Sequence, residues 1–478
     1  MKLLRKVALA LAVFCVGACL HETARVHATE PWSTYRGNLQ RTANTDGLAG
    51  PPSPRILWVF KSQEHFIAAP VPHGDQVLIA GLGAFNVSTF YCLSADPKAT
   101  QRTAWTKSTP YLKLPVVSSA ALAGDRIVFG DGMHQTDGAR LHCLQKQGLP
   151  LWQLEVPGTL VHLEGSPTIA NGKVYIGGGA AGVLCIDLDR ITLDGKEMPS
   201  AEIQKILDQK WKELQAKYEA DKKKDPDFAV PPNDDQLPKP SPRRVWQQGD
   251  GKWHVDAPVA VAGNRVLVAS AFLDKEKLGE RALFCLDSET GAIGWQTPLK
   301  VNPWGGPSVS GETVVISGST IGYDPKALKG ARGEVAAFSL ADGKEKWHKE
   351  LPGGVLSCVA LADGLAVATT TDGKVRAFDL ASGERHWIYE SKAPFFAAPA
   401  VAGGAVYAGD LRGVVHAVSL ANGKPLWTLD LANHPEVKAP GMIYGGPAVH
   451  GGRVFVATCN LEGAHAGQPN VVVCLGDK

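Results

Sequence analysis

The 478-residue sequence lacks an excess of charge, because 49 Lys and Arg residues balance 47 Asp and Glu residues. A nearly neutral chain has no basic field with which to bind the phosphates of nucleic acid. Long apolar runs are missing beyond the first twenty residues, and that run is too short to be a stable membrane anchor. Nucleic-acid binding and a membrane-embedded fold are therefore excluded.

The motifs of common catalytic sites are absent as well. No Cys or His spacing matches a zinc site, and no G-x-S-x-G nucleophile elbow occurs. The stretch Gly177 to Gly182 matches G-x-G-x-x-G, but a strand pattern follows at Val183 to Ile186 where a dinucleotide site needs a helix. We expect a turn at this glycine-rich stretch, and these patterns assign no catalytic residue and no metal ligand.

The first 28 residues have the pattern of an export signal. Basic residues precede the apolar run Val7 to Leu20, and two processing sites compete. Val26-His27-Ala28 is a small-residue cleavage site, whereas Val16-Gly17-Ala18-Cys19 resembles a bacterial lipobox. We therefore expect an exported protein in the periplasm or on the periplasmic face of a bacterial membrane. It is lipid-anchored if Cys19 is acylated, and soluble if Cys19 is only an apolar residue of a discarded peptide.

Glycine and proline are abundant, with 52 and 32 residues, and they favour short strands and tight turns over long helices. Tryptophan marks an internal repeat, because its successive spacings are 47, 47, 94, 49, 52, 40 and 40 residues. The doubled spacing indicates an insertion. The residues that define this period are Trp58, Trp105, Trp152, Trp246, Trp295, Trp347, Trp387 and Trp427.

Each repeat has the pattern of four short strands. The unit from Ala377 to Trp387 places a small residue on the third strand, a turn at Ser382-Gly383 and the Trp on the fourth strand. Four antiparallel strands in about 40 to 50 residues, repeated, are typical of a propeller blade. Eight units predict an all-β, eight-bladed propeller over residues 55–478, preceded by an N-terminal segment over residues 31–54.

The two ends of the repeat region complement each other. The last unit stops after its third strand at Leu475, while Arg55 to Phe60 has the pattern of a fourth strand without a unit of its own. Pairing of the two would close the ring and leave no open sheet edge.

The frame from Ala377 to Trp387 resembles the tryptophan-docking motif of the pyrroloquinoline-quinone (PQQ)-like propeller family, with Ser382 where the motif has Thr. Trp32 to Gly37 is similar to the N-terminal signature of that family. The resemblance implies that the eight periodic Trp residues are structural wedges between blades. It leaves two functional classes open, namely quinone-dependent dehydrogenases and non-catalytic propellers such as the BamB-type lipoprotein of the outer-membrane β-barrel assembly machinery.

Cysteine usage distinguishes these classes. The resemblance implies that a dehydrogenase carries two adjacent Cys residues beside its quinone and a calcium ion held by oxygen ligands. None of the nine Cys residues here adjoins another, so we expect no cofactor, with PQQ and calcium as the alternative. Five Cys residues instead occupy the third-strand position at which other repeats have Ala, which indicates packing: Cys92, Cys143, Cys185, Cys285 and Cys474.

The resemblance also implies a candidate ligand site, because in this family the connection before each first strand runs toward the central channel. Side chains at that register can bind a small polar ligand or a metal ion, or they form only a solvated channel rim. The residues are His65, His162, Glu164, Asp256, Asn302, Trp304, Phe395, Phe396 and Tyr444.

Residues 190–244 fill the doubled Trp spacing, between the third and fourth strands of the third repeat. The segment contains 23 charged residues among 55, which indicates a solvated excursion. Ser200 can cap a helix from Ala201 to Lys223 whose apolar stripe runs from Ile203 to Tyr218, and a Pro-rich return follows. We expect the insertion to be dispensable for folding, with the stripe covered by the protein's own blades or by a partner.

The sequence therefore predicts an exported, monomeric propeller that acts as a non-catalytic scaffold and binds another envelope protein. Contact with a membrane would be limited to a lipid on Cys19. Two alternatives remain open. One is a PQQ-dependent dehydrogenase or a cofactor-binding remnant, and the other is a carbohydrate-binding propeller that uses Trp304, Phe395, Phe396 and Tyr444 as stacking faces.

Replacement of Cys19 tests the lipid anchor. Because an acyl chain on Cys19 is the only membrane contact expected, C19S should move the protein from the membrane fraction to the soluble fraction of lysed cells. The matched variant C15S, altered within the same apolar run, should stay membrane-bound. An unacylated mature N-terminus at Thr29, found by mass spectrometry, would show that the protein is not a lipoprotein.

Overall fold

The computed structural model describes residues 30–134, 136–462 and 465–477. The predicted export signal over residues 1–28, with Cys19 and both processing sites, lies outside the described residues. No helix in the described part of the chain is both long and apolar enough to cross a membrane.

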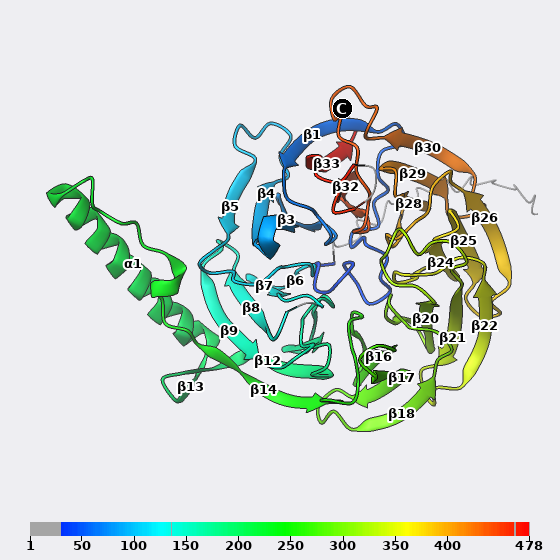
Figure 1. The fold of residues 1–478 in the computed structure, drawn as a ribbon, viewed down its shortest axis with the longest axis horizontal. Helices are drawn as coiled ribbons and strands as arrows, with labels where there is room; N and C mark the ends of the chain where they lie inside the picture. Colours follow the sequence, from blue (N-terminus) through cyan, green and yellow to red (C-terminus); the bar gives the residue numbers. More distant parts are fainter. Residues whose placement is uncertain (1–29, 135, 463–464, 478) are drawn as a thin grey trace, which may run out of the picture.

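Eight antiparallel sheets stand as blades around a central axis (Figure 1). The first strand of every blade has three residues and contacts the first strand of at least one neighbouring blade, so these short strands line the centre of the ring. The predicted all-β, eight-bladed propeller is confirmed.

Blade one contains β2 (Val71–His73), β3 (Gln76–Leu82), β4 (Ser88–Ser94) and β5 (Thr103–Lys107), and blade two contains β6 (Ala121–Ala123), β7 (Arg126–Gly130), β8 (Ala139–Gln145) and β9 (Pro150–Val156). Blade three contains β10 (Thr168–Ala170), β11 (Lys173–Gly177), β12 (Val183–Leu193) and β14 (Ser241–Gln248), and blade four contains β15 (Ala260–Ala262), β16 (Arg265–Leu273), β17 (Leu278–Asp287) and β18 (Ile293–Pro298). A 3-10 turn, η1 (Ala84–Asn86), lies between β3 and β4.

Blade five contains β19 (Ser308–Ser310), β20 (Thr313–Ser319), β21 (Gly333–Ser339) and β22 (Glu345–Leu351), and blade six contains β23 (Ala360–Ala362), β24 (Leu365–Thr370), β25 (Lys374–Asp379) and β26 (Arg385–Glu390). Blade seven contains β27 (Ala400–Ala402), β28 (Ala405–Gly409), β29 (Val414–Ser419) and β30 (Pro425–Asp430), and blade eight contains β31 (Ala448–His450), β32 (Arg453–Ala457), β33 (Asn470–Gly476) and β1 (Arg55–Ser62).

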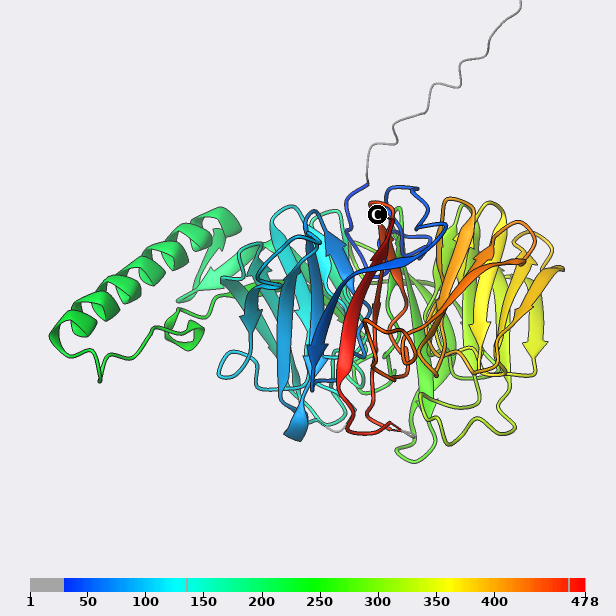
Figure 2. The ribbon, with the colours of Figure 1, turned by 90° about the horizontal axis from the view of Figure 1, so that it is seen from above.

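The last blade joins the two ends of the propeller. β1 pairs antiparallel with β33, from Arg55 opposite Gly476 to Ser62 opposite Asn470, and the two strands run side by side in Figure 2. The sheet order β1-β33-β32-β31 shows that β1 is the outer strand of this blade. The predicted closure of the ring by the N-terminal strand is correct, and it pairs two edges that would otherwise be open.

Each periodic Trp lies on an outer strand, directly opposite a small residue of the third strand. Trp105 faces Cys92 and Trp387 faces Ala377, and an equivalent pair occurs in all eight blades. The strand register shifts beside each of these pairs, and such bulges re-aim the side chains next to them. The small residue leaves room for the indole, which explains why Cys and Ala alternate at this position.

The indole rings reach the neighbouring blade. Seven of the eight indole N–H groups donate to a backbone carbonyl over 2.6 to 3.3 Å, six of them in the neighbouring blade and that of Trp427 at Pro51 of the N-terminal segment. Turn glycines lie beneath five of the rings, as Gly343 does beneath Trp295, and a Cβ on Gly343 would lie 2.5 Å from that ring. Gly343 also has a φ of 69°, which other residues rarely adopt. Each Trp therefore sets the contact between its blade and the next.

The cysteines take part in packing. All seven described cysteines are free and buried. Burial raises the pKa of the Cys92 and Cys474 thiols to about 12, so neither forms a thiolate near neutral pH.

The N-terminal segment runs through the centre of the ring (Figure 1). The backbone carbonyls of Gln40, Thr42 and Ala43 accept hydrogen bonds from the first strands of blades six, seven and eight, respectively. Thr34 forms a β-bridge with the first strand of blade three. The guanidinium groups of Arg36 and Arg41 are fully buried and donate to the carbonyls of Pro399 and Val259 on different sides of the ring. The segment therefore fills the channel and ties distant blades together.

The insertion separates β12 from β14 and adds a short strand, so blade three has five strands rather than the predicted four. It consists of β13 (Lys196–Pro199), α1 (Ser200–Lys224) and a return that contains η2 (Asp234–Gln236). The predicted cap at Ser200 is wrong, because Pro199 is the N-cap and no side chain caps the helix. The Ser200 hydroxyl instead donates to Asp189 and accepts a hydrogen bond from Arg126.

The apolar stripe of α1 is divided. Ile203 and Leu207, in the first two turns, are buried in a core shared with blades two and three. Trp211, Leu214 and Tyr218 further along are only partly buried, and most of the helix projects away from the ring (Figure 2). The helix therefore docks on its own blades at one end only.

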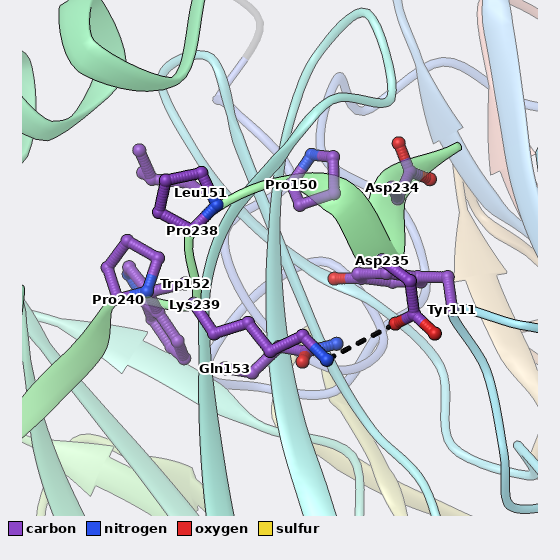
Figure 3. A pocket seen from close by; sticks show the side chains of 10 residues that line it. All are labelled: Tyr111, Pro150, Leu151, Trp152, Gln153, Asp234, Asp235, Pro238, Lys239 and Pro240. Atoms are coloured by element: carbon purple, nitrogen blue, oxygen red, sulfur yellow. Dashed lines mark hydrogen bonds and ion pairs between the residues drawn. The ribbon is translucent and has the colours of Figure 1, made fainter. Parts of the chain in front are cut away.

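The return of the insertion covers Trp152. In other blades, the turn between the third and fourth strands packs against the Trp of the preceding blade. In blade three, the insertion takes the place of this turn. Pro238 and Pro240 line a small pocket with Trp152 (Figure 3), and the Gln153 N–H donates to the Pro240 carbonyl over 3.0 Å. Among the eight periodic Trp residues, which all lie in the described part of the chain, only Trp152 has an indole N–H without a hydrogen-bond partner. The insertion therefore supplies packing that Trp152 would otherwise lose.

Two deletions separate the docked and projecting parts. Replacing residues 215–231 with a Gly-Ser linker should leave the Tm unchanged, because such loops change length at modest entropic cost. Replacing residues 195–240 also removes Ile203, Leu207 and Leu237, which are buried. At roughly 1.5–3 kcal/mol for each buried aliphatic side chain, the larger deletion should cost about 5 kcal/mol or more. Thermal unfolding followed by circular dichroism measures both, and equal Tm values would contradict a structural role for the docked end.

Candidate functional site

The two faces of the ring differ in what covers them. Because neighbouring strands are antiparallel, the turns between first and second strands lie on one face, and the connections between blades lie on the other. The N-terminal segment reaches the first face, where Asp46 accepts a hydrogen bond from Gly451 in a turn of blade eight. The opposite face is the channel mouth to which the sequence analysis assigned its candidate residues.

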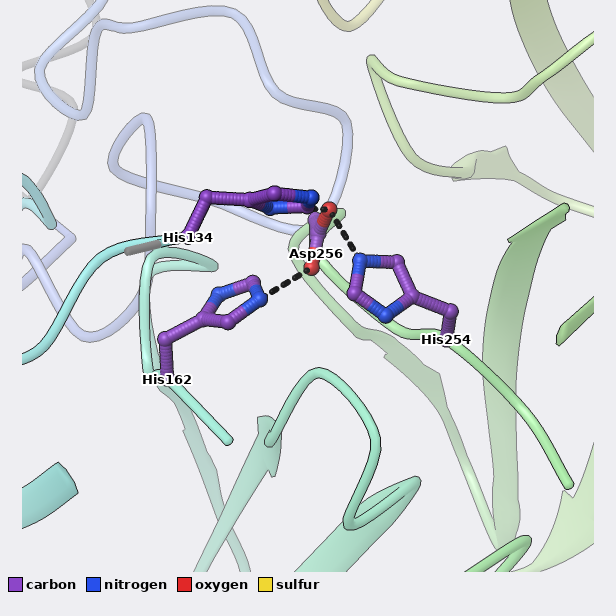
Figure 4. Close-up of side chains that lie close together, drawn as sticks. All are labelled: His134, His162, His254 and Asp256. Carbon is purple, nitrogen blue, oxygen red and sulfur yellow. Dashed lines mark hydrogen bonds and ion pairs between the residues drawn. The ribbon is translucent and has the colours of Figure 1, made fainter. Parts of the chain in front are cut away.

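Four side chains from three loops meet at this mouth (Figure 4). His134 lies between β7 and β8, His162 lies between β9 and β10, and His254 and Asp256 lie between β14 and β15. Their ligand atoms all lie within 4.8 Å of one another. We call these four residues the mouth cluster.

Asp256 lies at the centre of the mouth cluster. Its Oδ2 is 2.8 Å from His254 Nε2 and 3.9 Å from His134 Nδ1, and its Oδ1 is 3.5 Å from His162 Nε2. The three imidazole centroids are 4.8 to 5.3 Å apart. The side chains of His162 and His254 are fully buried, whereas 40% of the His134 side chain is exposed. The cluster is therefore open to solvent on the His134 side.

Burial and proximity shift the pKa values of these groups. Burial lowers the pKa of His162 to about 4; the charge of Asp256 opposes this shift, and repulsion from His254 and His134 adds to it. Burial by itself would raise the pKa of Asp256, but the three histidines outweigh it and lower the value to about 2. Burial and the charge of Asp256 raise the pKa of Glu164 to about 8. Near neutral pH the mouth cluster therefore contains a neutral His162 imidazole beside an ionised Asp256 carboxylate.

The glycine-rich stretch Gly177 to Gly182 makes room for this arrangement. It forms a turn between β11 and β12, as the sequence predicts. A Cβ on Gly179 would lie 2.8 Å from His162 Nε2, and Gly179 has a φ of 58°. Gly179 also pairs with Val255, the residue between His254 and Asp256. The motif that resembles a nucleotide fingerprint therefore positions two of the loops that carry the mouth cluster.

The sequence pattern predicts His162, Glu164 and Asp256 at the mouth but not His134 or His254, and it assigns no metal ligand. The repeat contains a signal for His254, because it lies six residues before β15, just as His162 lies six residues before β10. His134 lies in a connection within blade two and has no counterpart in that register. The sequence offers no signal that brings it to the mouth.

Two of the remaining candidate residues hold the connections between blades. His65 Nδ1 accepts a hydrogen bond from the Asn460 N–H over 3.1 Å. The Asn302 amide oxygen accepts from the Phe272 N–H and from Arg281, both over 3.0 Å. Neither side chain joins the mouth cluster.

The aromatic candidates divide into buried and partly exposed residues. Phe395 and Phe396 are each 1% exposed, and their rings pack on His416 and Tyr444 with centroids 5.5 and 5.4 Å apart. Trp304 and Tyr444 are partly exposed. The structure therefore leaves two of the four predicted stacking faces open to a ligand.

These features define the class of the protein, which is a PQQ-like eight-bladed propeller with a filled channel. The sequence matches the model of the family described as "Outer membrane protein assembly factor BamB" over residues 49–211, 237–326 and 324–466. The chain belongs to this family. No curated protein sequence matches it.

Solved structures with the same fold include members of both functional classes. BamB from Moraxella catarrhalis is similar with a TM-score of 0.58 at 14% identity, over 89% of this chain and 100% of that one. A europium-containing methanol dehydrogenase has a TM-score of 0.63 at 13% identity, over 95% and 99% of the two chains. Quinohemoprotein alcohol dehydrogenase from Comamonas testosteroni has a TM-score of 0.57 at 14% identity, over 95% and 82%. At these identities the likeness shows the fold alone.

Proposed function

We propose that the protein is a non-catalytic scaffold of the bacterial envelope that binds another protein through the projecting part of its insertion. We call residues 211–232 the insertion tip. The exposed apolar surface of this tip carries the proposal. Phe228 and Val230 are 82% and 78% exposed, and Trp211 and Tyr218 line a groove together with Pro232. Apolar and aromatic groups gathered on a projecting element are typical of protein-binding surfaces.

The charge of the insertion tip supports a protein partner over a membrane surface. The tip has five basic and five acidic residues, so it has no net charge with which to bind anionic lipid. The description of the family as an outer membrane protein assembly factor supports a partner in the outer membrane or the periplasm. The expected export signal would bring the chain to the same compartment.

The alternative of a quinone-dependent dehydrogenase requires a calcium site that the mouth does not fit. Calcium takes about six to eight oxygen ligands, whereas the mouth cluster offers three imidazoles and one carboxylate. The sequence also has no adjacent cysteines. The third candidate, a carbohydrate-binding propeller, loses support because Phe395 and Phe396 are buried. We therefore place the function at the insertion tip.

An activity assay tests the dehydrogenase alternative. Purified protein supplied with PQQ and calcium should reduce no redox dye with alcohols or aldose sugars, because the calcium ligands are missing. Heat-denatured protein is the control. Turnover above that control would overturn the scaffold proposal, and its loss in E164Q or D256N would place the active site at the mouth.

Site-specific cross-linking tests the binding surface. A photoreactive residue at Phe228 should cross-link a discrete envelope protein in cells, whereas the same residue at Leu426, which is 54% exposed on blade seven, should not. The double variant Y218S/F228S should weaken retention of that partner about tenfold or more, because aromatic anchors dominate such interfaces. The matched variant L426S should bind normally. Equal cross-linking at both positions, or equal binding by both variants, would contradict the proposal.

A further inference from the structure

We propose that the mouth cluster binds one divalent transition-metal ion, with Zn²⁺ as the reference case, through His134, His162, His254 and Asp256. This site is independent of the insertion tip and goes beyond the proposed scaffold function. Four protein ligands complete a tetrahedral coordination sphere, which is typical of structural zinc sites. The ion would join loops of blades two, three and four and would act as a clamp.

The spacing of the ligand atoms fits a single ion. Bonds from zinc to nitrogen and oxygen are about 2.0–2.2 Å long, so two ligand atoms of one ion are at most about 4.4 Å apart. The four ligand atoms of the mouth cluster lie within 4.8 Å of one another. His134, whose Nδ1 is 3.9 Å from Asp256, is the most exposed member of the cluster. Binding of one ion therefore requires the widest spacing to shorten by at most about 0.4 Å.

Several buried polar atoms of the mouth cluster have no hydrogen-bond partner. They are His162 Nδ1, His162 Nε2, His254 Nδ1 and Asp256 Oδ1. Burying such an atom without a partner is unfavourable, because it loses its hydrogen bonds to water, and one carboxylate cannot satisfy three imidazoles. A metal ion would satisfy the nitrogen and oxygen lone pairs that face the centre of the cluster.

Other buried His–carboxylate contacts in this protein show what a purely structural arrangement looks like. His142 Nε2 lies 2.7 Å from Asp131, and its Nδ1 lies 3.1 Å from the Gln153 amide. His416 Nε2 lies 3.0 Å from Asp410, and its Nδ1 lies 2.9 Å from the Tyr389 hydroxyl. Each of these carboxylates has one histidine, and both nitrogens of that histidine have partners. The mouth cluster differs in both respects.

Glu164 has the position of a supporting residue around a metal. One of its oxygens accepts a hydrogen bond from the backbone N–H of His134 over 2.5 Å and lies 3.6 Å from His162 Nδ1. A carboxylate beside the outer nitrogen of a ligating imidazole fixes the tautomer and raises the basicity of the inner nitrogen. If a metal binds His162 Nε2, the nitrogen nearest Asp256, then Nδ1 carries the proton, and Glu164 is the carboxylate beside it at 3.6 Å.

The donor set also selects the kind of metal. Three imidazoles and one carboxylate suit zinc and its first-row neighbours, whereas calcium and magnesium prefer oxygen ligands throughout. Cobalt(II) is a useful probe, because it takes the place of zinc in tetrahedral sites and its visible spectrum reports the geometry.

The test uses the tag-free mature chain, stripped with a chelator and dialysed. Titration with Zn²⁺ in a calorimeter should show one binding site, and Ca²⁺ should show none. Co²⁺ should give the intense visible bands of tetrahedral coordination. Zn²⁺ should also raise the Tm in a concentration-dependent way, because it binds only the folded chain.

Matched variants distinguish the site from chance binding to surface histidines. H162A and H254A should each lose zinc affinity about a hundredfold or more, and E164Q should lose about 10–100-fold, as supporting residues of metal sites do. H386A alters an exposed histidine of blade six and should bind as the parent does. H134A keeps the proposal testable if the buried variants fail to fold, because His134 is partly exposed. Absence of a stoichiometric site, or unchanged affinity in folded H134A, would overturn the proposal.

Discussion

The contact between a Trp of one blade and the neighbouring blade is the interaction on which the rest of the structure depends. A single four-stranded blade with a three-residue inner strand buries little by itself, and the apolar clusters of this protein extend across blade boundaries. The indole bridges that boundary, since it faces a small residue on its own sheet and lies over a turn glycine of the next. Loss of one such buried Trp side chain would cost about 3–5 kcal/mol.

The features of the fold that depend on the Trp contact were predicted from the sequence. Details that depend on other tertiary contacts were not. The Trp period defined the eight blades, and the orphan strand at Arg55 predicted the closure that pairs β1 with β33. Helix α1 was predicted to within one residue at each end, but its cap was not, because the hydroxyl of Ser200 bonds to Asp189 rather than to the helix. Tertiary partners that lie far apart in sequence decide such details.

The candidate site shows the same limit. The register before each first strand located His162 and Asp256, and a stricter alignment of the repeats would have added His254. His134 comes from a connection within blade two, where the sequence pattern sets no direction for the side chain. Four residues spread over 123 positions of sequence form one cluster only because three loops of the ring converge. That convergence is a property of the closed ring and not of any single repeat.

The positions of the two irregular features are related. Trp152 meets the insertion in place of a turn glycine and lacks the indole hydrogen bond of the other seven, so the boundary between blades two and three has the least regular contact. The mouth cluster spans the same boundary, with His134 on the blade-two side and His254 beyond blade three. The N-terminal segment hydrogen-bonds to blades six, seven and eight across the ring, and on this side it bridges to Thr168 of blade three. A metal clamp at the mouth would therefore hold the arc of blades in which the tryptophan contact is modified and on which the insertion is carried.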